Sequence, residues 1–167
     1  MAAAKKKDDA NSDGIKTIAV NRRARHEYFI EESFEAGIML TGSEVKSLRA
    51  GKAHIQEAYG RMRKGELWLV GAHITEYLPA AQFGHEPTRE RKLLLHRREL
   101  DRLAGKVKEL GLALVPLRLY FKHGLAKLEI GLARGKKLHD KRESIKERES
   151  HREVDRHLKS GRRQYDA

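Results

Sequence analysis

The stretch VPLRLYFKHGLAKLEIGL, residues 115–132, is the most informative about the fold. On both sides of residues 122–124, apolar and polar side chains alternate with the period of two that is typical of a half-buried strand. The Lys-His-Gly segment between the two runs is short and contains a glycine, which favours a tight turn. We therefore predict a β-hairpin with one apolar face. That face is predicted to consist of Leu117, Leu119, Phe121, Ala126, Leu128, Ile130 and Leu132.

Two stretches earlier in the chain have the same period. The run HEYFIEESFEAGIML, residues 26–40, predicts a strand that continues after a bend. The run AYGRMRKGELWLVGAHI, residues 58–74, predicts a second hairpin with its turn at Lys64 and Gly65.

Two segments change to helical spacing. TGSEVKSLRAG, residues 41–51, begins with Thr41 and Glu44 at the spacing of a capping box. HRRELDRLAGKVKELG ends at Gly111 and has one apolar stripe, made of Leu100, Leu103, Val107 and Leu110. Several short strands with few helices predict a mainly β fold: a small closed antiparallel barrel of the oligonucleotide-binding type, with flanking α-helices and a flexible C-terminal tail. An open α+β sheet is the alternative.

The composition limits the classes of partner. Lys and Arg number 36 against 24 Asp and Glu, a formal net charge of +12, which favours a polyanionic partner. No apolar run reaches the roughly 18 residues of a membrane-spanning helix, so we expect no membrane-embedded segment. The absence of cysteine excludes disulfides and thiolate metal sites, and it fits a cytoplasmic protein.

The apolar residues lie mainly between Ile18 and Leu132. We therefore predict a flexible N-terminal arm over residues 1–17, a β-barrel domain over 18–133, and a basic C-terminal tail over 134–167. The tail carries twelve basic and seven acidic residues and almost no apolar ones. Because it cannot bury a core, we expect it to be disordered in the free protein.

The sequence offers little for catalysis. None of the nine histidines has a persuasive metal-ligand spacing, and GLARGKK lacks the gap and the hydroxyl residue of a phosphate loop. No serine lies in a nucleophile-elbow motif. We expect no enzymatic activity, no metal and no cofactor.

Basic residues are grouped near three predicted elements. Any one of them could simply increase solubility, but three groups together favour a surface that contacts phosphates. The predicted contacts are Arg22, Arg23 and Arg25 before the first long strand, Lys46, Arg49 and Lys52 around the first helix, and Arg91 and Lys92 before the second. Glu35 is an acidic exception, which could anchor one of the arginines or accept hydrogen bonds from the edge of an unpaired base.

Three segments together resemble one family. NRRARHEYFIEESFEAGIMLTGSEVKSLRAGKAHI, PTRERKLLLHRREL and GKKLHDKRESIKERE are similar to the SmpB family, the tmRNA (SsrA RNA)-binding proteins of bacterial trans-translation. The resemblance runs from about Ile18 to Glu149. It implies an oligonucleotide-binding-type barrel that binds the tRNA-like part of tmRNA, where it takes the place of an anticodon arm. It also implies delivery, with elongation factor Tu, to ribosomes stalled on broken messages.

The resemblance also implies particular contacts. Those with tmRNA are expected at Asn21, Glu35, Leu94 and His96. The tail near the ribosomal decoding centre is expected to use Gly135, Lys136, Lys137, His139, Asp140, Lys141 and Arg142. Two positions depart from the family pattern: Ser43 replaces a larger side chain, and Ser150 replaces an aromatic one.

The rest of the tail has the pattern of a two-sided helix. At roughly 100° per residue, one side carries Lys141, Arg148, Arg152, Arg156, Lys159 and Arg163. Asp140, Glu143 and Glu147 lie opposite. We predict that this helix forms when its basic side lies along RNA, and the resemblance implies the mRNA channel of the ribosome as the place.

Two other functions are less consistent with the sequence. A general single-strand-binding barrel would use a surface of exposed aromatics, but these are only 6% of residues and are mostly predicted to face the core. An RNA-modifying enzyme is disfavoured by the missing motifs. An RNA-binding adaptor is the preferred interpretation.

Overall fold

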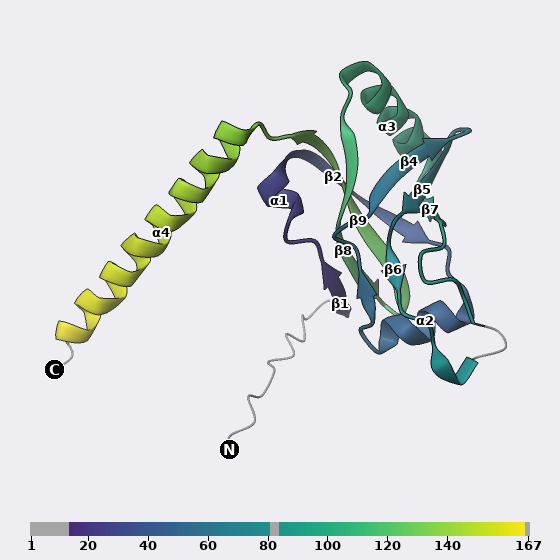
Figure 1. The fold of residues 1–167 in the computed structure, drawn as a ribbon, viewed down its shortest axis with the longest axis horizontal. Coiled ribbons are helices and arrows are strands. Elements are labelled where there is room, and N and C mark those ends of the chain that lie inside the picture. The colour runs from purple at the N-terminus through teal and green to yellow at the C-terminus, as the bar shows by residue number, and fades with distance from the viewer. Residues whose placement is uncertain (1–13, 81–83, 166–167) are drawn as a thin grey trace.

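The computed structural model describes residues 14–80 and 84–165, so most of the predicted N-terminal arm lies outside the described residues. One large antiparallel sheet dominates the fold (Figure 1). Its strands are β1 (Ile15–Val20), β2 (Tyr28–Ile38), β4 (Tyr59–Arg63), β5 (Glu66–Val70), β7 (Arg91–Leu94), β8 (Ala113–Lys122) and β9 (Leu125–Gly135). A separate pair consists of β3 (Ala53–His54) and β6 (His73–Ile74).

The large sheet closes on itself. The strand order is β1-β8-β4-β5-β7-β2-β9, and β9 also pairs with β8. The predicted mainly β fold is therefore confirmed as a ring, and the open sheet is excluded. The pairing between β4 and β8 is the shortest in the ring, and it joins Gly60 to Leu114. A Cβ atom at Gly60 would lie 2.7 Å from Leu114 Cβ, so only glycine lets the two strands approach here.

The apolar core fills the ring. Its fully buried members come from strands on all sides and include Leu67, Leu69, Leu93, Leu119, Leu128, Ile130 and Leu132. The β8–β9 hairpin turns at His123 and Gly124, as predicted, and both residues have positive φ angles of 50° and 78°. This is the backbone conformation that a two-residue hairpin loop requires.

One detail of the predicted hairpin is wrong. Leu117 does not share a face with Leu119 and Phe121, because the β8–β9 register shifts between Pro116 and Arg118. Such a bulge adds one residue and reverses the alternation of side chains. Leu117 therefore packs outside the ring, in a small cluster with Ala24 and Val115 beneath the single turn α1 (Ala24–Glu27).

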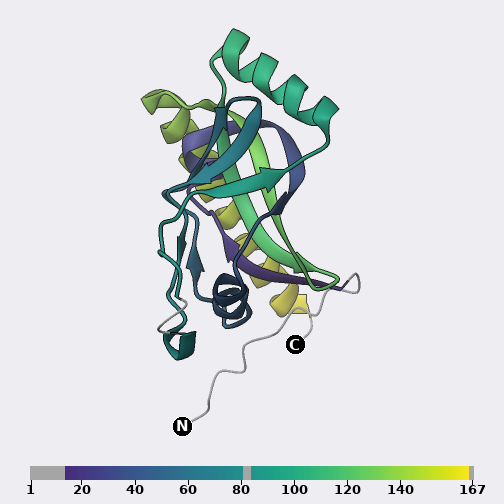
Figure 2. The same cartoon turned by 90° about the vertical axis from the view of Figure 1, so that its right-hand side faces the viewer.

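The two predicted helices are present. Helix α2 (Gly42–Arg49) has the expected capping box, in which the Thr41 amide donates to Glu44 Oε2 at 2.8 Å. Helix α3 (Arg97–Leu110) ends at Gly111 in the left-handed conformation. Its predicted apolar stripe is shorter than expected, since Leu103 is buried but Leu110 is 62% exposed. Figure 2 shows α3 and α2 at opposite ends of the ring. A short 3-10 turn, Leu78–Ala80, follows β6.

The predicted domain limits differ from the strands. β1 begins at Ile15, inside the predicted arm, because its backbone pairs with β8 from Ile15 opposite Lys122. β9 continues through Gly135, past the predicted start of the tail. The tail then forms helix α4 (Leu138–Tyr165), which leaves the ring beside α1 (Figure 1). Its predicted disorder in the free protein stays a prediction. Among the described residues, no helix is long and apolar enough to cross a membrane.

Candidate nucleic-acid interface

Glu35 lies on the outer face of the ring, at the centre of a small polar network. Tyr120 Oη, two strands away on β8, donates to Glu35 Oε2 at 2.5 Å, and Lys122 Nζ lies 3.3 Å from the same oxygen. The hydrogen bond from Tyr120 lowers the pKa of Glu35, with Lys122 acting in the same direction. The side chain of Glu35 is 38% exposed. It is therefore an ionised, oriented acceptor, anchored by a tyrosine and a lysine and not by the predicted arginine.

Leu94 extends this outer face. It pairs with Gly37 across β2 and β7, and it is 49% exposed. Because Gly37 follows Glu35 by two residues on β2, all three positions point to one side of the sheet. His96 comes two residues after Leu94 as the exposed N-cap of α3, and its amide donates to Glu99. The structure thus brings three of the four family-matched positions onto one exposed surface.

Asn21, the fourth family-matched position, is only 5% exposed. Its Nδ2 donates to the Pro116 carbonyl at 2.9 Å, and its Oδ1 accepts from the Ala24 amide. Both ends of the side-chain amide therefore serve the protein itself. These bonds hold the start of α1 against β8. The direct contact of Asn21 with RNA stays a prediction.

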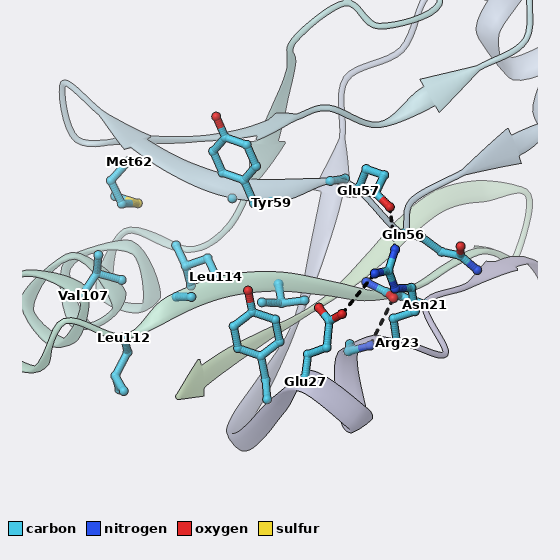
Figure 3. Close-up of a pocket in the computed structure, with 16 residues that line it drawn as sticks. Asn21, Arg23, Glu27, Gln56, Glu57, Tyr59, Met62, Val107, Leu112 and Leu114 are labelled. Carbon is cyan, nitrogen blue, oxygen red and sulfur yellow. Dashed lines mark hydrogen bonds and ion pairs between the residues drawn. The ribbon is translucent and has the colours of Figure 1, made fainter. Parts of the chain in front are cut away.

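Arg23 is occupied by two carboxylates. Its Nη1 lies 2.7 Å from Glu57 and its Nη2 lies 3.2 Å from Glu27, as Figure 3 shows. The three residues lie on the rim of a cleft of about 410 Å³, whose opposite end is lined by apolar residues such as Val107 and Leu114. Since its charge is balanced locally, Arg23 is a poorer phosphate ligand than the sequence suggested.

Arg91 contradicts its prediction most clearly. It is completely buried, and its Nε donates to Glu44 Oε1 at 2.8 Å. Its remaining donors reach the carbonyls of Ala72, Arg89 and Pro87. A buried guanidinium with all these partners cannot contact RNA, so the role of Arg91 is structural. The sequence pattern of residues 92–95, KLLL, did not indicate that the side chain of Arg91 points into the protein.

The other predicted basic residues are accessible but scattered. Lys92 is partly exposed and pairs with Glu66 at 2.7 Å. The cluster around α2 is exposed, and one of its lysines lies 5.4 Å from the Tyr77 ring. It comprises Lys46, Arg49 and Lys52. Because α2 and α3 lie at opposite ends of the ring, this cluster and His96 do not form one continuous patch.

The first tail residues attach the tail to α1. The Lys136 amide donates to the Glu27 carbonyl at 2.8 Å, and Lys136 Nζ donates to the Arg25 carbonyl at 2.9 Å. Asp140 accepts from the Lys137 amide and so orients the start of α4. The predicted ribosome-contacting residues divide accordingly. Gly135 ends β9, and Lys136, Lys137 and Asp140 make these contacts. Lys141 is half-buried, and Arg148 is exposed and lines a cleft with residues of the main domain. The other predicted tail contacts are exposed: His139, Arg142, Arg152 and Arg156.

Sequence reasoning missed Tyr120 and Lys122, the partners of Glu35. They are 85 and 87 residues away in the chain, and only the β2–β9–β8 pairing brings them together. Within the described residues, no three His, Asp or Glu side chains are grouped as metal ligands.

A closed antiparallel sheet with an exposed polar network and several basic groups defines a nucleic-acid-binding β protein. Residues 18–160 match the family model described as SmpB protein, and the chain belongs to this family. An SsrA-binding protein of Roseiflexus castenholzii is 57% identical over 152 residues, covering 90% of this chain and 96% of its own. One of Desulforudis audaxviator is 57% identical over 141 residues, covering 84% and 92%.

A solved chain has the same fold. It comes from the structure "tmRNA-SmpB: a journey to the center of the bacterial ribosome" and is 50% identical to this chain, with a TM-score of 0.62. The match covers 76% of this chain and 93% of the solved one.

Proposed function

We propose that this protein is an RNA-binding adaptor that binds the tRNA-like domain of tmRNA and brings it to stalled ribosomes for trans-translation. The similarity to proteins named SsrA-binding protein extends over nearly their whole length, and this observation carries the proposal. The exposed surface of Glu35, Leu94 and His96 supports it, because a fixed carboxylate beside apolar and imidazole groups can recognise unpaired bases. No catalytic role is part of the proposal.

The finer parts of the proposal concern the other partners. We infer that elongation factor Tu takes part through the shared tmRNA complex, and that the tail contacts the decoding centre and the mRNA channel in the cytoplasm. The exposed arginines of α4 support a role along RNA, since arginine binds phosphate groups bidentately.

A general single-strand-binding function is less well supported. Contrary to the sequence-based expectation, Phe29 and Tyr59 are exposed. Each, however, is close to a cation of the protein itself: Lys136 lies 4.8 Å above the Phe29 ring, and Arg61 lies 5.8 Å from that of Tyr59. The two rings lie on different strands and do not make a row on which successive bases could stack.

The RNA that co-purifies with the protein tests the function most directly. We expect one dominant structured RNA, tmRNA, when the tagged protein is isolated from bacterial cells and its RNA is sequenced. A mixture of unrelated single strands would support the general binder and contradict the adaptor.

Replacement of Glu35 by alanine is expected to weaken binding of tmRNA by about 1–3 kcal/mol, although it removes a negative charge. Long-range electrostatics alone predicts tighter binding, because repulsion from phosphate decreases. We expect the opposite because the change removes a fixed acceptor for base edges and leaves Tyr120 and Lys122 without their common partner. Filter binding with the tRNA-like fragment measures the effect. Glu31→Ala on the same strand, which frees only Arg134, is the matched control and should bind normally. Unchanged or tighter binding of folded Glu35→Ala would refute this role.

A further inference from the structure

A second cleft lies between the ring and the tail helix. It has a volume of about 630 Å³ and is bounded by the end of β1, α1, the middle of β8 and one side of α4. Four arginines from three parts of the chain line it: Arg22 and Arg25 near α1, Arg118 on β8, and Arg148 on α4. Arg22 and Arg25 belong to the predicted tmRNA surface, and Arg148 belongs to the predicted ribosome-contacting tail. The structure brings both sets to one opening.

The charge of this cleft is unbalanced. Four guanidinium groups face a single carboxylate, that of Glu129. Glu129 lies 3.4 Å from Arg118 Nε, and this nitrogen is inaccessible to solvent and has no hydrogen-bond partner in the described part of the chain. Arg22, Arg25 and Arg148 make no ion pair with any described residue. Like charges gathered around one opening repel one another, and a bound anion would remove the repulsion.

Phosphate is the anion that fits this set of ligands. Arginine presents a planar fork of donors that matches the oxygens of a phosphate. Arg118 is held in place, because its guanidinium lies 4.6 Å from the Tyr120 ring centroid. Asn21 fixes the segment that carries Arg22 and Arg25 by its bonds to Pro116 and Ala24. The main-domain side of the cleft is therefore preorganised.

The position of Arg148 links the cleft to the direction of helix α4. Helix α4 is fastened to the ring at Lys136, through the carbonyls of Glu27 and Arg25. Arg148 follows the first residue of α4, Leu138, by ten residues, which is about 15 Å along a helix. A helix fastened at one end can swing, whereas a helix fastened at two points has a fixed direction.

We propose that this arginine cleft binds a backbone phosphate of the RNA partner, and that the phosphate fastens α4 to the ring and so sets the direction of the tail. The inference rests on the proposed function, because the bound RNA supplies the phosphate. RNA binding by the barrel and orientation of the tail are then linked events. The tail is directed only when tmRNA is present.

The absence of cysteine makes a distance measurement simple. Spin labels at Glu109→Cys on α3 and Val154→Cys on α4, both at exposed positions, report the direction of α4. With the tRNA-like fragment of tmRNA, we expect the distance distribution to narrow in the otherwise unchanged protein. With Arg148→Gln added, it should stay broad. The same variant should lower the salt dependence of RNA affinity by about one unit of slope, which is the share of one phosphate contact.

Lys146→Gln is the matched control, because it removes a positive charge from the same helix at an exposed position that does not line the cleft. We expect it to keep the narrow distribution and the original salt slope. If the RNA binds normally and the two variants give equal distributions, the phosphate clamp is overturned while the proposed function stands. If the unchanged protein does not bind the fragment at all, the proposed function fails and the clamp with it.

Discussion

Truncation after Leu138 is expected to abolish peptide tagging on stalled ribosomes while leaving most of the affinity for tmRNA. Residues 139–167 contain nine basic and seven acidic residues, so their removal lowers the net charge by only two. That change is too small to abolish binding through long-range attraction. The surface of Glu35, Leu94 and His96 lies on the ring and is not touched. A tagging assay in vitro, together with filter binding, measures both quantities on one preparation.

A milder pair of variants separates the arrangement of charge from its total. Arg152→Glu with Arg156→Glu reverses the basic side of α4, and both residues are exposed and do not line the cleft. Glu143→Lys with Glu147→Lys makes the opposite change on the other side of the helix. We expect the first pair to impair tagging severely and the second to be tolerated better. If tagging survives the truncation, or if both pairs behave alike, the basic side of α4 does not act along RNA.

Local features of the fold were predictable because they depend on neighbouring residues. The turn at His123-Gly124 needs positive φ angles, the capping box of α2 needs Thr41 and Glu44 three residues apart, and α3 needs a residue such as Gly111 to end it. Each is a short-range condition that one sequence either meets or does not meet. The β-hairpins followed from the same kind of pattern. Their number favoured a closed barrel but left an open sheet as the alternative.

What could not be predicted depends on pairing over long distances. The bulge in β8 turns Leu117 outward, although the alternation of side chains predicts an inward position. Arg91 looked like one of several basic surface residues until the fold placed it beside Glu44, 47 residues earlier. In the same way, Arg148 and Arg22 line one cleft because of where β9 ends and the tail helix begins. The role of a charged residue therefore depends on its position in the strand pairing and on its side-chain contacts, more than on the residues beside it in the sequence.

Glu44→Gln is expected to cause a large loss of stability although the change is isosteric. Glu44 and Arg91 both have fully buried side chains, and their ion pair is 2.8 Å long. Arg89 Nη2 and the Thr41 amide also donate to Glu44 Oε2, each at 2.8 Å. Removing the carboxylate charge leaves the Arg91 guanidinium buried without a counter-charge, which typically costs about 3–5 kcal/mol. Urea unfolding followed by circular dichroism measures the free energy of unfolding.

The dependence of this loss on pH identifies its cause. Burial raises the pKa of Glu44, but hydrogen bonds from Arg89 and the Thr41 amide, together with the charge of Arg91, outweigh burial and hold the pKa below its ordinary value. A carboxyl whose pKa is lowered by folding contributes stability above its unfolded pKa and loses it as the pH falls through the folded value. The difference in the free energy of unfolding between the unchanged protein and Glu44→Gln should therefore be largest near pH 7 and decrease in acid.

Glu66→Gln is the control, because it breaks the partly exposed pair with Lys92. It should cost far less at every pH, since solvent screens that pair. Equal losses for the two variants at pH 7 would mean that Glu44 does not compensate a buried charge.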